Sequence, residues 1–323
     1  MLVSIIIPVY NVGPYVKVAI ASVLNQTVTE GVEIIAVDDG STDDSYTCLV
    51  EIAKTDSRIK IIKQNNRGVS AARNAGMRAA TGKYVVFLDA DDIMPPNALE
   101  ILISGMEADE RNVLSSGSTV KITSYDQPLD KKEDAPCSNT TENTLEKLLS
   151  WKYSMSACAK LFVKELIGDI TFVEGKKINE DKFFLAQYLI KNRGLVYETG
   201  KNVYGYYTRE GSASMGKFLP KDLDAIYFSE RIEQEVNSAI PELSSRALYN
   251  SLATRLQVLK KIVRTDCYKE NRELFFSIRK DTVALSKKVP WSWGYKAERF
   301  SLALGGFAYR ACVKLFLFIT GRK

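Results

Sequence analysis

Short apolar segments that alternate with helical patterns near the start of the chain constrain the fold more than any other feature. The segments rich in β-branched residues cover residues 3–9, 33–37, 59–62 and 84–88. Helical patterns fill residues 15–26, 44–56 and 69–81 between them. Strands that alternate with helices form βαβ units, in which helices cover both faces of a mainly parallel sheet. We therefore expect an α/β fold.

A polar motif follows each apolar segment. The four motifs are Pro8-Val9-Tyr10-Asn11, Asp38-Asp39-Gly40-Ser41, a stretch over residues 65–76 with Arg67, Gly68 and Arg73, and Asp89-Ala90-Asp91-Asp92. In open α/β sheets, ligands bind beyond the carboxyl ends of the strands, which is where these motifs fall. No G-x-G-x-x-G follows the first segment, which argues against a dinucleotide-binding dehydrogenase.

The acidic motif at residues 89–92 is a candidate metal site. If the strand before it stays extended, Asp89 and Asp91 point to the same side. Carboxylates that close repel each other unless a cation lies between them, and their hard oxygens suit Mn²⁺ or Mg²⁺. The alternative is an acidic turn before the helix expected near Asn97, and we predict that Asp92 caps this helix.

The residue types present restrict the chemistry. The chain has no histidine, so acid–base catalysis must use carboxylates. The five cysteines have no metal-binding spacing and are odd in number, which favours reduced thiols in a cytosolic protein. The first apolar segment lacks a basic region before it, so we expect a core strand there and no signal peptide.

The four motifs together resemble the nucleotide-sugar half of a family 2 glycosyltransferase with the GT-A fold. The resemblance rests on their order and spacing and covers roughly the first hundred residues. It implies a Rossmann-like nucleotide-sugar-binding sheet flanked by helices and followed by a mostly helical C-terminal region. It also implies inverting transfer of a hexosyl or N-acetylhexosaminyl group from a UDP-sugar, in the assembly of a bacterial capsule, exopolysaccharide or O-antigen.

The resemblance assigns donor-binding roles to the first three motifs. It places Asp38 and Asp39 at the base, with Asp39 the stronger candidate, although the pair could instead cap a helix with Ser41 and Thr42. Arg73 would contact the nucleotide, or form a buried ion pair with one of the aspartates, or do both. The remaining residues implied to bind the donor are Pro8, Tyr10, Asn11, Arg67 and Gly68.

The resemblance also implies the catalytic roles. Asp89 would contact the ribose, with Ala90 beside it, and Asp91 would ligate the divalent cation. Glu180-Asp181 matches the second acidic pair of the family, in which the aspartate is the general base and Glu180 would orient the acceptor. The alternative for Asp181 is a carboxylate stabilised by a helix N-terminus. Arg209 matches a basic loop near the diphosphate.

Two other functions remain open. A nucleotidyltransferase that makes an activated sugar would need a glycine-rich loop with a basic residue after the first strand, and none is present. A nucleotide-sugar-binding protein without turnover would not need both Asp91 and Asp181.

The rest of the chain suggests two domains. We expect a catalytic domain at 1–217, with a nucleotide-sugar half at 1–95 and an acceptor half at 96–217, and a helical region at 218–323. The acceptor half contains a polar stretch at 125–143, which is either a linker or a loop over the acceptor, and a strand at 196–207. Helical patterns fill residues 222–238, 241–264 and 271–286.

The last 37 residues carry most of the basic character, with eight basic residues against one acidic residue. Their aromatic and leucine positions, with Arg310 and Lys314 among them, predict a helix that lies in the interface of an anionic membrane. The alternative is a helix packed on the catalytic domain or in a dimer. Because the rest of the chain is not basic, nucleic acid is not expected as a partner. We expect a glycan acceptor, linked to a lipid because the tail is expected at a membrane. We also expect a cytoplasmic enzyme at the inner face of the cell membrane.

Overall fold

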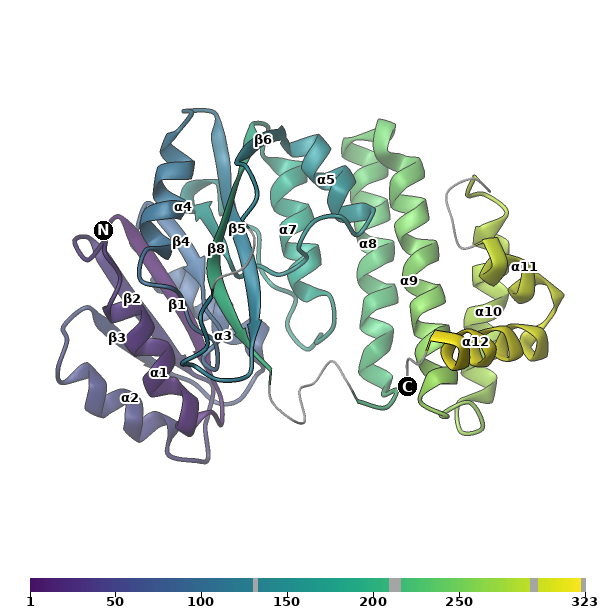
Figure 1. The fold of residues 1–323 in the computed structure, drawn as a ribbon, viewed down its shortest axis with the longest axis horizontal. Coiled ribbons are helices and arrows are strands. Elements are labelled where there is room, and N and C mark those ends of the chain that lie inside the picture. Colours follow the sequence, from purple (N-terminus) through teal and green to yellow (C-terminus); the bar gives the residue numbers. More distant parts are fainter. Residues whose placement is uncertain (130–132, 209–215, 291–295, 321–323) are drawn as a thin grey trace. The chain divides into compact units, whose positions relative to one another are not determined.

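The computed structural model describes residues 1–129, 133–208, 216–290 and 296–320, and Figure 1 shows its ribbon. Contacts divide the chain into two compact units. The sheet unit comprises Met1–Leu145, Ser154–Lys176 and Glu180–Glu210, and the helical unit comprises Glu146–Tyr153, Lys177–Asn179 and Gly211–Lys323. The domain limits expected from the sequence stay a prediction.

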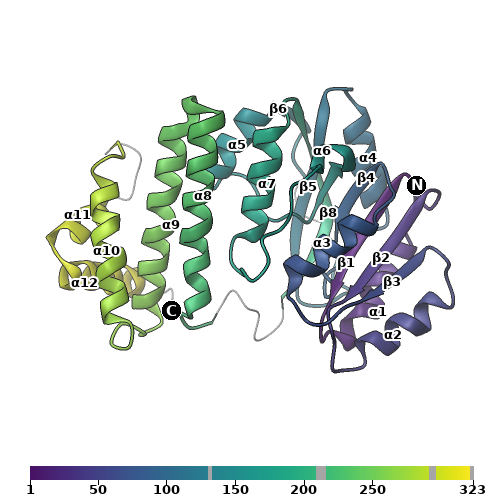
Figure 2. The same cartoon turned by 180° about the vertical axis from the view of Figure 1, so that it is seen from behind.

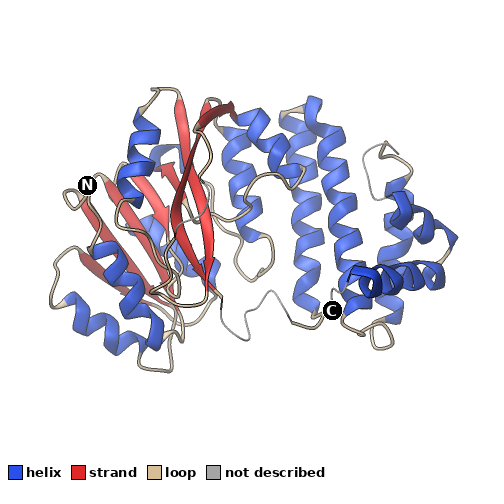
Figure 3. Ribbon diagram, in the orientation of Figure 1, coloured by secondary structure: helices blue, strands red, loops and turns tan. Residues whose placement is uncertain are grey.

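The sheet unit contains a mixed sheet, shown in red in Figure 3. In the described residues its eight strands run in the order β3-β2-β1-β4-β7-β5-β8-β6. Their bounds are Val3–Val9 (β1), Val32–Asp38 (β2), Ile59–Lys63 (β3), Tyr84–Phe87 (β4), Asn112–Ile122 (β5), Cys137–Thr140 (β6), Lys160–Val163 (β7) and Leu195–Tyr207 (β8). The expected α/β fold is confirmed.

Strand direction divides the sheet into two parts. Strands β1 to β4 are mutually parallel, whereas β7 runs antiparallel to both of its neighbours, β4 and β5. Beyond it, β8 is parallel to β5 and antiparallel to β6. Neither β6 nor β7 was expected, because each has only four residues and β6 lies in the polar stretch expected to be a loop.

Helices cover both faces of the sheet. Helices α1 (Gly13–Leu24) and α2 (Ser45–Ala53) lie on the face seen in Figure 1, and α3 (Val69–Ala79) lies on the opposite face, seen in Figure 2. The other helices of this region are α4 (Ala98–Glu107), α5 (Thr141–Leu149), α6 (Lys164–Ile167) and α7 (Glu180–Lys191). A buried aromatic cluster supports α7, since Phe184 stacks on Phe172 with ring centroids 4.2 Å apart.

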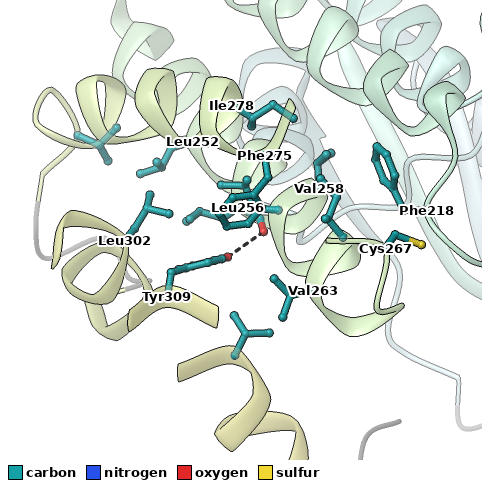
Figure 4. Close-up of a cluster of buried hydrophobic side chains, with 14 residues drawn as sticks. Phe218, Leu252, Leu256, Val258, Val263, Cys267, Phe275, Ile278, Leu302 and Tyr309 are labelled. Carbon is teal, nitrogen blue, oxygen red and sulfur yellow. Dashed lines mark hydrogen bonds between the residues drawn. The ribbon is translucent and has the colours of Figure 1, made fainter. Parts of the chain in front are cut away.

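The helical unit is built on α8 (Asp224–Ala239), α9 (Ser244–Arg264), α10 (Arg272–Ser286), α11 (Lys296–Leu304) and α12 (Gly306–Thr320). Its core includes Leu252 and Leu256 of α9, Phe275 of α10 and Tyr309 of α12 (Figure 4). The Tyr309 hydroxyl donates a hydrogen bond to the Leu256 carbonyl at 3.3 Å, so a polar group at the centre of this core is satisfied.

The basic tail forms two helices rather than the single helix expected. Gly305 separates α11 from α12 with a φ of +141°, a backbone conformation that favours glycine. None of the helices in the described ranges is both long and apolar enough to cross a bilayer.

Candidate functional site

Arg73 lies at the centre of the predicted site and is almost fully buried. Small residues let α3 approach the sheet, since a Cβ added to Gly76 would lie 2.3 Å from Cγ2 of Ile6 in β1. From this helix, Arg73 Nη1 donates to Asp181 Oδ1 at 2.5 Å, and Nη2 donates to Asp89 Oδ1 at 2.8 Å. One guanidinium therefore joins the acidic motif after β4 to the acidic pair of α7.

The charges around Arg73 balance the cost of burying it. Glu180 Oε1 is a third carboxylate oxygen nearby, 3.9 Å from Arg73 Nη1. Burial lowers the pKa of Arg73, but the charges of Asp181 and Asp89 outweigh this effect and raise it above its ordinary value. The ion-pair alternative for Arg73 is confirmed, and its contact with a nucleotide stays a prediction.

Asp181 is held in place from two sides. Its Oδ2 atom accepts hydrogen bonds from the Ala157 backbone N–H at 3.0 Å and from the Ser156 hydroxyl at 3.4 Å, while Oδ1 faces Arg73. Its side chain is 19% exposed, so it is not sealed from solvent. Because Oδ1 has a second lone pair, this carboxylate can still accept a proton from a hydroxyl placed beside it.

Glu180 has a different environment from its neighbour. Its side chain is 13% exposed. Burial, together with the negative charge of Asp181, raises the pKa of Glu180 from 4.5 to about 7. Two adjacent carboxylates in different environments are typical of acid–base sites. In such sites a carboxylate with a raised pKa, as Glu180 has, can exchange a proton near neutral pH.

The raised pKa predicts a pH-dependent stability difference for Glu180→Gln. The folded state holds the Glu180 proton more tightly than the unfolded chain, so this stabilisation is present below pH 4.5 and is lost as the pH rises through about 7. On going from below pH 4.5 to above pH 7, the free energy of unfolding of the variant should therefore rise by about 2–3 kcal/mol relative to that of wild type. Urea unfolding at pH 5 and pH 8 measures the difference. The exposed Glu107→Gln on α4 is the control, and an equal effect of Glu180→Gln at both pH values would contradict the prediction.

The acidic motif after β4 forms a turn. The strand ends at Phe87, and the Asp92 backbone N–H donates to the Asp89 carbonyl at 3.0 Å, so the condition under which Asp89 and Asp91 would point to the same side is not met. The prediction that Asp92 caps a helix is wrong. Its carboxylate accepts hydrogen bonds from the Tyr204 hydroxyl at 2.6 Å and the Tyr207 N–H at 2.7 Å, and Asn97 precedes α4 instead.

Burial determines the protonation of the Asp92 carboxyl group. Burial and the nearby charge of Asp89 raise the pKa of Asp92 to about 8. Asp89 and Asp92 are thus both engaged with protein groups. Asp91, in the same turn, is partly exposed, and its backbone carbonyl accepts a hydrogen bond from the Tyr125 hydroxyl at 2.8 Å.

Asp38 and Asp39 organise the loops after β2. Both are buried. Asp39 Oδ1 accepts from the Arg67 N–H at 2.9 Å, and Oδ2 accepts from the Gly68 N–H at 2.7 Å, so Asp39 positions the loop that begins α3. Asp38 Oδ1 accepts from the Ser41 N–H at 3.3 Å, whereas its Oδ2 is buried with no hydrogen-bond partner among the described residues. Contact of either aspartate with a base stays a prediction.

The other predicted donor residues surround these loops. Asn11 Oδ1 accepts from the Thr42 N–H at 2.8 Å, and Tyr10 is 47% exposed. Arg67 forms an exposed ion pair with Glu174 at 2.5 Å. Pro8 is the penultimate residue of β1 and Ala90 is buried in the acidic turn. Arg209 lies outside the described residues.

Sequence reasoning did not identify several groups that shape the site. Tyr204 comes from β8, and its hydroxyl donates a hydrogen bond to Asp92 Oδ2. The same hydroxyl accepts a hydrogen bond from the Asp89 N–H at 3.2 Å. Ser156 and Ala157 hold Asp181 from a segment more than twenty residues away. The pattern of residues 196–207 predicted a strand, but nothing in the sequence paired Tyr204 with the acidic motif.

Comparison with known proteins agrees with this arrangement. Residues 4–162 match the model of the family "Glycosyl transferase family 2". The chain is 28% identical over 227 residues to the glycosyltransferase GlyG of Streptococcus pneumoniae, a match that covers 67% of this chain and 74% of GlyG. It is 31% identical over 261 residues to GlyA of the same organism, but spans only 37% of that longer protein.

The fold is also that of a solved glycosyltransferase. Residues 1–349 of Staphylococcus aureus TarS, in a crystal structure with UDP-GlcNAc, superpose with a TM-score of 0.74 at 20% identity, covering 99% of this chain and 92% of the TarS fragment. A second solved structure, the mannosyltransferase of Pyrobaculum calidifontis with GDP-Man and Mn²⁺, has a TM-score of 0.54 at 16% identity. Family match, relatives and GT-A fold agree: this chain belongs to the family 2 glycosyltransferases.

Proposed function

We propose that this glycosyltransferase moves a sugar from a UDP-sugar to a glycan hydroxyl with inversion, and that Asp181 is the general base. The observation that carries the proposal is the pair of hydrogen bonds from Arg73 to Asp89 and Asp181. They bring the motif expected at the donor and the pair expected at the acceptor to one point beyond β4. Inverting displacement needs this proximity. The base must take the proton of an acceptor hydroxyl that attacks the anomeric carbon from the side opposite the diphosphate.

The acidic turn fits a divalent cation bound mainly through the donor. Among the described residues, no group of three or more Asp, Glu or Cys side chains could hold a metal by itself. Mg²⁺-type sites often use one or two carboxylates and complete their coordination with substrate phosphates and water. Asp91 would hold the cation, the role that the family resemblance assigns to it, and its side chain is partly exposed. Bound there, Mn²⁺ or Mg²⁺ would neutralise the leaving diphosphate.

Two solved structures support the choice of donor and metal. TarS was crystallised with UDP-GlcNAc, which supports a UDP-sugar, and the mannosyltransferase was solved in complex with GDP-Man and Mn²⁺, which supports a divalent cation. From the sequence resemblance and the expected membrane tail, we propose that the acceptor is a glycan of a bacterial surface polymer, attached to a lipid. The predicted contacts of Arg209 with the diphosphate remain part of this proposal.

Nucleotide binding tests the proposed function. Calorimetric titrations of the full chain with UDP, GDP, CMP and NAD, each with Mn²⁺ and with chelator, should give metal-dependent binding of UDP and at least tenfold weaker binding of the others. Preference for GDP would change the donor class. Binding of NAD, or of no nucleotide, would overturn the proposal.

Asp91→Asn tests the metal site directly. A neutral amide is a poorer ligand for a hard cation than a carboxylate, so the Kd for UDP with Mn²⁺ should rise by about 10- to 100-fold or more. In the presence of chelator, wild type and variant should bind UDP equally. Asp169→Asn is the matched control, since Asp169 is 87% exposed and distant in sequence from the motif. Unchanged Mn²⁺-dependent affinity would show that Asp91 is not the ligand.

A further inference from the structure

The outer side of α11 and α12 carries a concentrated set of exposed apolar side chains. We call them the tail face, which consists of Phe300, Leu304, Phe307, Leu315, Phe318 and Ile319. The other large exposed apolar side chains in the described residues are Phe276 of α10, Phe316 of α12, and Met1, Tyr10 and Leu219, which occur singly. Single exposed apolar residues are ordinary, but a contiguous group marks an interaction site.

Helical geometry explains why the tail face stays uncovered. Tyr309 and Val313 of α12 are four residues apart and are buried in the core of the helical unit. Phe307, Lys314 and Phe318 are spaced by seven and four residues, which places them on the opposite side of the same helix. Phe307 is 79% exposed and Phe318 is 85% exposed. The helix is therefore apolar on both sides, and its own unit covers only one of them.

Cations lie beside exposed phenylalanines at two pockets. One pocket places Lys287 and Lys288 beside Phe300 of the tail face. The other, on the side of α12 that also carries Val313, places Lys260 and Lys296 beside Phe316. The second pocket has a volume of about 200 Å³. Its acidic residue, Glu298, pairs with Lys260 at 2.5 Å, and Lys314 lies 3.8 Å from the exposed Asp266.

We propose that the tail face binds the surface of an anionic phospholipid bilayer. Exposed aromatic and aliphatic side chains would enter the boundary between headgroups and acyl chains, and the bordering lysines would meet lipid phosphates. A second copy of the chain fits less well, because a symmetric contact of this face with itself would bring lysines against lysines. The proposal is independent of the donor and acceptor assigned above.

Vesicle sedimentation tests this surface. The full chain is mixed with vesicles of phosphatidylcholine alone, or of phosphatidylcholine and phosphatidylglycerol at 3:1, at low and high salt. Binding should require the anionic lipid and weaken with salt. The double variant Phe307→Ser/Phe318→Ser should lower the partition coefficient by about tenfold or more, and Lys287→Glu/Lys288→Glu should lower it only on anionic vesicles.

Matched controls keep the test decisive. Leu219→Ser removes one exposed apolar side chain outside the tail face, and Lys17→Glu/Lys54→Glu makes the same charge change on α1 and beyond α2. Both should bind vesicles like wild type, and all variants should keep wild-type UDP binding, which separates this proposal from the enzymatic one. Failure of wild type to bind anionic vesicles, equal loss in the controls, or a concentration-dependent dimer abolished by Phe307→Ser/Phe318→Ser would overturn the proposal.

Discussion

Asp181→Asn is expected to lower kcat for sugar transfer by about 10²- to 10⁴-fold, the usual contribution of a positioned general base. The amide keeps the shape of the side chain and can still accept the Ala157 N–H, but it cannot take a proton from the acceptor hydroxyl. Affinity for UDP should change by less than about twofold, because Asp181 faces the acceptor in the proposed mechanism. Steady-state transfer assays and calorimetric UDP titrations measure the two quantities.

A parallel variant separates Asp181 from its neighbour. Glu180→Gln should reduce kcat less than Asp181→Asn if Glu180 only orients the acceptor. The pKa of Glu180 is raised to about 7, a value suited to proton exchange at neutral pH. A larger loss of kcat in Glu180→Gln than in Asp181→Asn would therefore identify Glu180 as the base. Near-normal turnover of Asp181→Asn would show that its assignment is wrong.

Arg73→Met is expected to destabilise the protein by about 3–5 kcal/mol at pH 7. Methionine fills similar volume but leaves Asp89, Glu180 and Asp181 without their shared cation, and an uncompensated buried charge carries a cost of this size. Urea unfolding followed by circular dichroism measures the loss. At pH 4 the loss should be smaller, because Glu180 is then protonated and no longer repels the neighbouring carboxylates.

The same helix offers a matched control for Arg73. Arg78 lies in the last turn of α3 and is exposed, so Arg78→Met should change the free energy of unfolding by less than about 0.5 kcal/mol. Equal stability of the Arg73 and Arg78 variants would show that the three carboxylates do not depend on Arg73.

The sequence predicted the parallel part of the sheet well because its signals are local. Strand β1 matches its predicted bounds, and β2, β3 and β4 match within one residue at each end. These strands are short segments rich in β-branched residues, and each is followed by a polar motif. The position of the site followed from the same pattern, since the motifs lie at the ends of these strands.

Most of the site features that could not be predicted from the sequence depend on contacts between residues far apart in the chain. Asp92 has the spacing of a helix cap, but its partners, Tyr204 and Tyr207, lie more than a hundred residues later. Asp39 matched a base-binding position, whereas the hydrogen bonds it makes to the loop at Arg67 and Gly68 could not be read from the sequence. The division of the tail is different, since the Gly305-Gly306 pair is a local turn signal that the expectation of a single helix overlooked.

The position of β7 has a consequence for how the chain folds as it is synthesised. Strands β1 to β4 pair with one another and are complete once residue 87 has left the ribosome. The other edge of β4 pairs with β7, which begins only at Lys160. Until then, an apolar strand edge is open to pairing with another nascent chain, a condition that favours aggregation. The interval between residues 87 and 160 is therefore where chaperone binding would protect the growing polypeptide most.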